Sequence, residues 1–321
     1  MRQFSSEVEA ADGLFETYQS LNKEISKVVI GQNEVIKLLL TSIFCQGHCL
    51  LVGVPGLAKT LLIQTIASAL DLKYNRIQFT PDLMPSDIIG AETLDKDRNF
   101  KFIKGPIFAN IILADEINRT PPKTQAALLE SMQEYSVTIA GFNYKLDRPF
   151  FVLATQNPIE QEGTYPLPEA QLDRFMFNIL LDYPSYKSEV DIVKNTTTDI
   201  TVEVNKILGG EDIQFYQHLV RRVPIADNVV EYAVNLVHKT RPGTQNASEI
   251  SNDYLEWGAG PRASQFLVIA AKCNALLNGK YSPDIENIRE VAKPILRHRI
   301  VRNFKAEAEG ITVENIIDKL L

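Results

Sequence analysis

Apolar residues along the chain form two kinds of pattern, short continuous runs and longer segments with helical spacing. One helical segment carries Leu62, Ile63 and Ile66 on one side, and others cover 14–28 and 32–44. The continuous runs, which predict strands, lie at 48–52, 74–79, 111–114, 150–154 and 175–181. Because continuous apolar strands separated by helices are typical of a parallel sheet covered on both faces, the pattern predicts an α/β fold.

Two segments interrupt this alternation. Residues 90–107 place Phe100 and Phe102 beside a polar turn at 95–99, and residues 136–148 place Val137 and Ile139 before a glycine turn. Both patterns favour β-hairpins. Each hairpin precedes an apolar strand, so we expect two hairpin insertions into the α/β core.

The pattern changes after Pro184. The remaining apolar positions recur with helical spacing, at 216–220, 229–237, 263–277 and 288–301. We therefore expect two domains, an α/β core over residues 1–184 and a smaller all-helical lid over residues 185–321.

Composition narrows the class of protein. The 321 residues are 45% hydrophobic and 23% charged, with a net charge of -7, which is typical of a soluble globular protein and argues against polyanion binding driven by bulk charge. The start of the chain is acidic and polar, and the apolar runs are far shorter than a membrane span, so we expect no signal peptide and no membrane span. Three cysteines, Cys45, Cys49 and Cys273, are too few for a disulfide framework. We interpret them as reduced thiols in a cytoplasmic protein. A metal site at Cys45, His48 and Cys49 is not expected, because no second Cys/His cluster completes it.

A glycine-rich loop follows the first predicted strand and precedes a predicted helix. Its residues are Gly53, Val54, Pro55, Gly56, Leu57, Ala58, Lys59 and Thr60. Such a loop can direct backbone N–H groups and a helix N-terminus at phosphate, with Lys59 on the β- and γ-phosphates and Thr60 on Mg²⁺. Ala58 stands where glycine is usual, which is tolerable if its backbone is already helical. The alternative interpretation is a glycine turn with an incidental lysine.

A second motif makes the phosphate-binding hypothesis stronger. The apolar run at 111–114 ends in Asp115 and Glu116, 56 positions beyond Lys59. At a strand end beside the loop, Asp115 can reach the water shell of Mg²⁺, and Glu116 can polarise an attacking water. The alternative is an acidic helix cap.

Three further polar residues lie at element ends. Asn157 follows the run at 150–154 and could bond the γ-phosphate or the water, although Asn before Pro158 is also ordinary turn chemistry. Arg174 precedes the last core strand, where a salt bridge with a neighbouring residue is the alternative. Arg262 lies in the first turn of a helix, where the dipole does not favour a cation, so we expect an anionic partner, either phosphate or a structural carboxylate.

Taken in order, these motifs resemble an AAA+ ATPase of the MoxR family. The resemblance covers roughly residues 20–305. The matching segments are Val29–Gln32, Gly53–Thr60, Ala114–Arg119, Pro121–Gln125, Ala154–Pro158, Leu167–Phe175, Gly260–Ser264 and Leu296–Arg299. Alanine at the position of Ala58 is common in that family.

The resemblance implies roles for these residues. Gly53–Thr60 is similar to Walker A, and Asp115 with Glu116 is similar to Walker B. Asn157 resembles sensor 1, Arg174 an arginine finger, and Arg262 sensor 2 acting on its own or a neighbouring subunit's nucleotide. Ile30 and Gly31 resemble part of the adenine pocket, Thr60 and Asp115 the Mg²⁺ site, and the hairpins the helix-2 and pre-sensor-1 inserts. Arg119 could also face a neighbour.

The family implies an ATP-hydrolysing remodelling factor or chaperone. It would act on protein clients as a homo-oligomeric ring, expected to be a hexamer, with a von Willebrand factor A domain protein as a possible partner. A nucleic-acid motor is the alternative, favoured by basic residues between Arg289 and Lys305 but opposed by the net charge of -7. A nucleotide-gated scaffold is a third interpretation, and Glu116 argues against it because a scaffold needs no water-orienting carboxylate.

Overall fold

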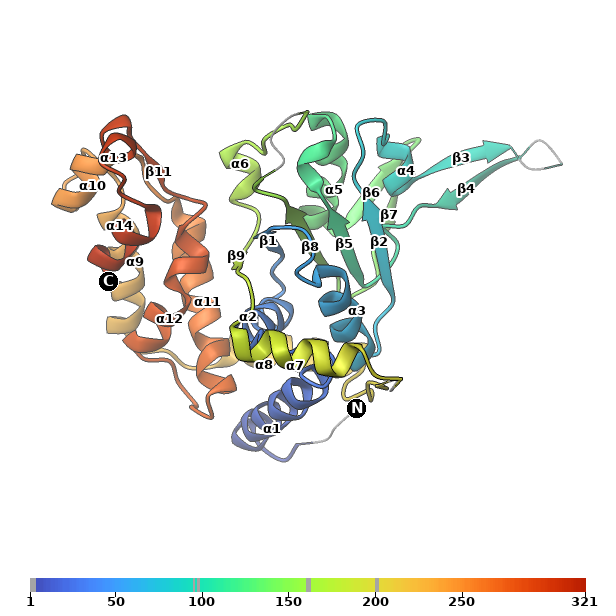
Figure 1. Cartoon of the computed structure of the whole chain (residues 1–321), viewed down its shortest axis with the longest axis horizontal. Coiled ribbons are helices and arrows are strands. Elements are labelled where there is room, and N and C mark those ends of the chain that lie inside the picture. The colour runs from blue at the N-terminus through green and yellow to red at the C-terminus, as the bar shows by residue number, and fades with distance from the viewer. Residues whose placement is uncertain (1–3, 95, 97–98, 160–162, 200–201) are drawn as a thin grey trace. The chain divides into compact units, whose positions relative to one another are not determined.

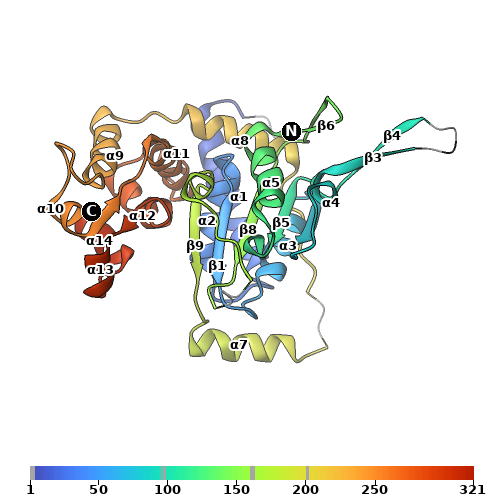
Figure 2. The same ribbon diagram turned by 90° about the horizontal axis from the view of Figure 1, so that it is seen from above.

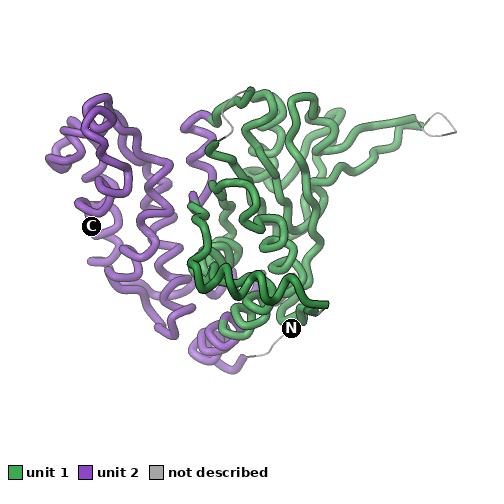
Figure 3. The backbone as a smooth tube through the Cα atoms, in the orientation of Figure 1, with its two compact units in different colours: residues 1, 19–167, 179–214 green, residues 2–18, 168–178, 215–321 purple. Residues whose placement is uncertain are grey.

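The computed structural model describes residues 4–94, 96, 99–159, 163–199 and 202–321 (Figure 1). These residues form two compact units (Figure 3). Unit 1 lies within 19–167 and 179–214, and unit 2 within 4–18, 168–178 and 215–321. Each unit therefore combines segments that are distant in sequence, and a boundary between contiguous domains near residue 184 stays a prediction.

Unit 1 is built around a five-stranded sheet with the strand order β2-β5-β8-β1-β9. The strands are β1 (Cys49–Gly53), β2 (Tyr74–Gln78), β5 (Ile111–Asp115), β8 (Phe151–Gln156) and β9 (Phe177–Leu181). The pairs β2/β5, β5/β8 and β1/β8 are parallel, which confirms the predicted sheet. β5 and β8 are buried at nearly every position, whereas the edge strand β2 reads Tyr-Asn-Arg-Ile-Gln and buries only Ile77 fully. An edge strand has a free side, so it tolerates the polar residues that the inner strands exclude.

Helices alternate with the strands of this sheet along the chain, as the apolar spacing predicts (Figure 1). In α3, Leu62, Ile63 and Ile66 are fully buried, and the helix contacts β5. Burying each such side chain contributes roughly 1.5–3 kcal/mol relative to leaving it exposed. The helices of unit 1 are α2 (Asn33–Phe44), α3 (Lys59–Ala69), α4 (Pro85–Ile89), the 3₁₀ turn η1 (Ile117–Arg119), α5 (Pro122–Glu134) and α7 (Tyr186–Thr196). Helices α1 (Glu7–Ile25) and α8 (Gly210–Arg222) each have residues in both units.

Both predicted hairpin insertions are present in unit 1. β3 (Gly90–Leu94) pairs with β4 (Phe100–Lys104), and β6 (Ser136–Ile139) pairs with β7 (Phe142–Lys145). Figure 1 shows the β3–β4 hairpin extending away from the sheet. The turn predicted at 95–99 lies mostly outside the described residues. The rings of Phe102 and Tyr144 lie 4.3 Å apart, so the two insertions contact each other.

Unit 2 is predominantly helical, in agreement with the expected lid (Figure 2). Its central helix, α11 (Pro261–Leu277), packs against α9 (Asp227–Lys239) and α12 (Ile285–Leu296). Small buried residues, Ala270 and Ala271 among them, allow close approach of the helices. The other elements are α6 (Glu169–Leu172), α10 (Glu249–Tyr254), α13 (Phe304–Ala308), α14 (Val313–Leu320) and an antiparallel pair formed by β10 (Leu255–Trp257) and β11 (Val301–Arg302).

Within the part of the chain that the structure describes, no helix combines the length and the apolar character needed to cross a lipid bilayer.

Candidate active site

The carboxyl ends of the inner strands meet at one edge of the sheet. The register pairs Gln78 with Asp115 and Leu51 with Thr155. Because all these strands run in parallel, the residues that follow them lie along the same edge. The glycine-rich loop begins there, at Gly53, which is the last residue of β1.

The glycine-rich loop bends through left-handed backbone conformations. Gly56 has φ +86°, a value that favours glycine. Gly53 is required for a different reason, since a Cβ atom there would lie 2.8 Å from the Cβ of Leu181. Ala58 has φ 55° and ψ 28° immediately before α3. We expected alanine to be tolerable here if its backbone were helical. The backbone of Ala58 lies in the left-handed region, which is unfavourable for a residue with a Cβ atom.

Lys59 opens α3 with its ammonium group turned back toward the loop. Its Nζ donates a hydrogen bond to the carbonyl oxygen of Gly53. Partial burial lowers the pKa of Lys59, while the nearby carboxylates of Asp115 and Glu116 raise it. A partly desolvated cation that has one neutral acceptor is suited to bind an anion in the loop.

Asp115 is held by three donors that come from two neighbouring strands. Its Oδ2 accepts hydrogen bonds of 2.6 and 3.1 Å from Arg76, and its Oδ1 accepts one of 2.6 Å from the hydroxyl of Thr155. The same Thr155 hydroxyl accepts a 2.9 Å bond from the backbone N–H of Glu116. Thr155 therefore fixes both acidic residues through one oxygen atom.

Glu116 adopts a left-handed backbone conformation, with φ 57° and ψ 50°. Such a conformation is costly for a residue other than glycine and is concentrated at functional sites. The Oε2 atom of Glu116 accepts hydrogen bonds from Gln78 at 3.0 Å and from Arg119 at 3.1 Å. Arg119 thus contacts Glu116 of its own chain, and a role toward a neighbouring subunit stays a prediction.

Asn157 follows β8 and is 6% exposed. Its Oδ1 accepts a hydrogen bond of 3.1 Å from the backbone N–H of Ile159. Its amide Nδ2 is buried and has no hydrogen-bond partner among the described residues. A buried donor without a partner is costly, so this atom fits a site that receives an additional acceptor such as a phosphate or water oxygen.

The segment before the loop packs closely against other parts of unit 1. Gly31 has φ +79°, and a Cβ atom there would lie 2.6 Å from the Oγ of Ser188. Gln32 Nε2 reaches the carbonyl of Leu57 at 3.4 Å. Ile30 and Gly31 therefore lie in a segment joined to the loop, and their contact with a base stays a prediction.

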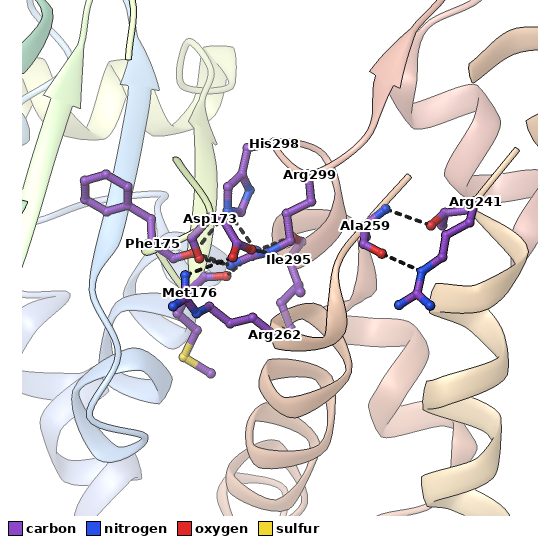
Figure 4. A network of polar contacts seen from close by, with 10 residues as sticks. Asp173, Phe175, Met176, Arg241, Ala259, Arg262, Ile295, His298 and Arg299 are labelled. Atoms are coloured by element: carbon purple, nitrogen blue, oxygen red, sulfur yellow. Dashed lines mark hydrogen bonds and ion pairs between the residues drawn. The ribbon is translucent and has the colours of Figure 1, made fainter. Parts of the chain in front are cut away.

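Arg174 and Arg262 both belong to unit 2. The guanidinium of Arg262 binds Oδ2 of Asp173 at 2.9 Å, so its anionic partner in this structure is a carboxylate. The other oxygen of Asp173 pairs with Arg299 at 2.7 Å (Figure 4). Their roles toward nucleotide stay predictions.

Sequence reasoning missed several of these contacts. Arg76 and Gln78 are polar residues on alternate positions of an edge strand, and that alternation is the signal that could have indicated them. Thr155 lies two residues before Asn157 at the same strand end. The link from Arg299 to Asp173 spans 126 positions, and no local pattern could indicate it.

The six arginines and lysines between Arg289 and Lys305 are each paired with a carboxylate inside unit 2. The pairs are Arg289–Glu286, Lys293–Asp318, Arg297–Glu314, Arg299–Asp173, Arg302–Glu307 and Lys305–Asp253, at 2.7 to 3.9 Å. A row of cations neutralised in this way is a poor polyanion surface, which argues against the nucleic-acid motor.

The parallel sheet, the glycine-rich loop and the helical second unit define an ATPase of the AAA+ class. Residues 48–177 match the model of the ATPase family associated with various cellular activities, and residues 247–320 match the AAA lid domain.

Individual relatives narrow the class. The YeaC protein of Bacillus subtilis, of uncharacterised function, is 42% identical over 93% of this chain and 91% of its own length. The chaperone MoxR1 of Mycobacterium tuberculosis is 40% identical over 97% of this chain and 83% of its own. A crystal structure of a candidate ATPase from Cytophaga hutchinsonii has a TM-score of 0.91 at 45% identity and covers 97% of this chain and 95% of that one. The chain belongs to the MoxR family of AAA+ ATPases.

Proposed function

We propose that this protein binds ATP with Mg²⁺ and hydrolyses it to remodel or mature client proteins. The observation that carries the proposal is the acidic strand end beside the glycine-rich loop, where Thr155 fixes Asp115 and Glu116 together. Lys59 lies near both carboxylates, and its pKa is lowered by partial burial and raised by their charges.

Binding is assigned to the loop and the adjacent strand end. The backbone N–H groups of Gly53–Thr60 and the ammonium of Lys59 bind phosphate oxygens, and Ile30 and Gly31 contact the base. Thr60 and Asp115 hold Mg²⁺ through their oxygen atoms. ATP supplies the phosphoanhydride bond, and Mg²⁺ neutralises charge on its phosphates.

Hydrolysis is assigned to Glu116 and Asn157. The carboxylate of Glu116 accepts a proton from the attacking water, and the hydrogen bonds from Gln78 and Arg119 hold the carboxylate in position. The buried Nδ2 of Asn157, which has no hydrogen-bond partner among the residues that the structure describes, donates to the water or the transferred phosphate. The Lys59 ammonium stabilises negative charge that develops in the transition state.

A ring completes this site. Arg174 acts as a finger on the nucleotide of a neighbouring subunit, and Arg262 exchanges Asp173 for a nucleotide phosphate of its own or a neighbouring chain. We expect a hexamer, with a von Willebrand factor A domain protein as partner. Nucleotide and assembly are then linked, so a slowly hydrolysed ATP analogue should increase the mass seen by sedimentation. An unchanged mass at micromolar protein would argue against the ring.

The insertions supply a surface for protein clients. Phe100 is 75% exposed, Phe142 64% and Ile103 54%, all on the β3–β4 and β6–β7 hairpins. Exposed apolar side chains grouped on two touching hairpins favour contact with unfolded or extended protein. A relative named as a chaperone supports this role.

Two variants test the proposed activity. Glu116→Gln should bind ATP normally and lose about a hundredfold or more in turnover, the usual scale for a general base. Lys59→Ala should lose ATP binding itself. Parental turnover in Glu116→Gln would refute the assignment of Glu116, and stimulation of the ATPase rate by nucleic acid at low salt would favour the motor.

A further inference from the structure

One buried side chain, Arg299, donates several hydrogen bonds to the short segment from Asp173 to Met176. The guanidinium of Arg299 donates from Nε to Oδ1 of Asp173 at 2.7 Å and from Nη2 to the Asp173 carbonyl at 2.8 Å. It also donates to the carbonyls of Phe175 at 2.6 Å and Met176 at 3.3 Å (Figure 4). All these residues belong to unit 2, so the network lies within one compact body.

Arg299 is itself held rigidly. Its side chain is 1% exposed, its Nη1 also donates to the carbonyl of Ile295, and its guanidinium lies 5.1 Å from the ring centre of Phe266. Burial lowers the pKa of Arg299 to about 10, and the Asp173 carboxylate raises it, so the side chain stays charged at neutral pH. A buried charge is stable only when its donors are paired, and each pairing here is directional.

The anchored atoms lie on both sides of Arg174. Arg299 bonds the carbonyl of the residue before it and the carbonyls of the two residues after it. The backbone of Arg174 therefore cannot move without breaking hydrogen bonds to a buried guanidinium. Apolar contacts alone would let the Asp173–Met176 segment slide, whereas a planar guanidinium with several directional N–H donors holds the segment in one position.

We propose that Arg299 is a positioning residue for Arg174, fixing the backbone from which the Arg174 side chain reaches a nucleotide phosphate. This inference rests on the proposed role of Arg174 in hydrolysis. Arg299 makes its contribution through the Asp173–Met176 segment and does not touch the nucleotide. Its effect should be on turnover, because a displacement of about 1 Å in a catalytic group can cost up to a hundredfold in rate.

The variant that tests this is Arg299→Lys, which keeps the buried charge but cannot reproduce the fork of hydrogen bonds. The matched control is Arg297→Lys, at the same helix end. Arg297 is also mostly buried, pairs with Glu314 and donates to the carbonyl of Asn178, beyond the anchored segment. We expect kcat to fall about tenfold or more in Arg299→Lys, with little change in the KM for ATP, and to stay near the parental value in Arg297→Lys.

A double-variant cycle separates positioning from general damage. If Arg299 acts through Arg174, the chain with both Arg174→Ala and Arg299→Lys should be no slower than Arg174→Ala alone. Hydrogen exchange in a peptide covering 168–178 should also rise in Arg299→Lys, while peptides of α9 and α14 stay protected. If Arg299→Lys does not fold, Asp173→Asn carries the same cycle in an Arg262→Ala background, because Asp173 pairs with both Arg299 and Arg262.

The outcomes are distinct. Three results would overturn the positioning role while leaving the proposed function intact. The first is a parental kcat in a folded Arg299→Lys protein, and the second is an equal loss of kcat in the Arg297→Lys control. The third is a double variant whose loss of kcat is the product of the two single losses. Parental turnover in Arg174→Ala alone would instead remove the proposed role of Arg174, and the inference with it.

Discussion

The hydroxyl of Thr155 donates a 2.6 Å hydrogen bond to Oδ1 of Asp115, joining the carboxyl ends of β8 and β5. It also accepts a bond from the N–H of Glu116, so one side chain supports the metal-binding and water-orienting candidates together. Neither Asp115 nor Glu116 could be displaced alone without loss of a contact at this hydroxyl.

Thr155→Val should remove both hydrogen bonds while keeping the shape of the side chain. A carboxylate oxygen and a backbone N–H would lose partners, which should lower the free energy of unfolding by about 1–3 kcal/mol and reduce ATP turnover. Thr155→Ser retains the hydroxyl and is the control. Urea unfolding and steady-state ATPase assays measure the two effects, and equal behaviour of Val and Ser would contradict the role of the hydroxyl.

Arg174→Ala should bind ATP nearly normally, because ground-state contacts come from Gly53–Thr60. Turnover should fall steeply, since a finger stabilises charge that develops in the transition state. Mixing Arg174→Ala chains with Lys59→Ala chains should restore some activity, because an intact loop on one chain can meet an intact arginine on another.

Subunit exchange has to be shown first for that mixture, by fluorescence transfer between labelled chains. If exchange occurs and the mixture stays inactive, Arg174 does not act on a neighbour, and Arg119 or Arg262 becomes the candidate.

His48 should make stability depend on pH. The buried imidazole accepts a hydrogen bond from the N–H of Val152 at Nδ1 and lies 3.1 Å from the carbonyl of Met132 at Nε2. Burial lowers the pKa of His48 from 6.5 to about 4. The unfolded chain therefore binds the proton first, and protonation of His48 should lower stability by at most about 3 kcal/mol as the pH drops from 6.5 toward 4. Burial also lowers the pKa of His298, which should add a loss of its own in acid.

Urea unfolding across that pH range measures the effect. His48→Gln should make the fall in stability less steep than in the parent, since one of the two buried histidines, His48 and His298, no longer titrates. His218 is exposed, so His218→Gln is the control and should retain the parental slope. A parental slope in His48→Gln would show that His48 is not the source.

Ala58→Gly should be no less stable than the parent. Alanine in the left-handed conformation costs roughly 1–2 kcal/mol, which offsets the greater chain entropy of unfolded glycine. Ala67 lies inside α3, where glycine costs about 1 kcal/mol, so Ala67→Gly gives the contrast. Equal destabilisation of the two variants in thermal unfolding would show that Ala58 carries no strain.

Local features of the sequence determined most of the fold and several site candidates. Apolar runs predicted the strands because inner strands of a parallel sheet are buried on both faces. Glycine spacing predicted the loop, and the hairpins were indicated by alternating residues around polar turns. The loop, Asp115, Glu116 and Asn157 could be proposed because each sits at the end of an apolar strand, and such ends meet at one edge of a parallel sheet.

Only the tertiary structure decided which side chains support those candidates. Arg76, Gln78 and Thr155 reach Asp115 and Glu116 through strand register, and their partners lie 38 to 40 positions away in sequence. Arg299 reaches Asp173 across 126 positions, from the end of α12 to the segment that carries Arg174. Side chains at such separations have no shared local pattern, because their proximity is produced by the packing of whole elements. The left-handed conformation of Ala58 was likewise decided by the closure of the loop against α3, which overrides the preference of alanine.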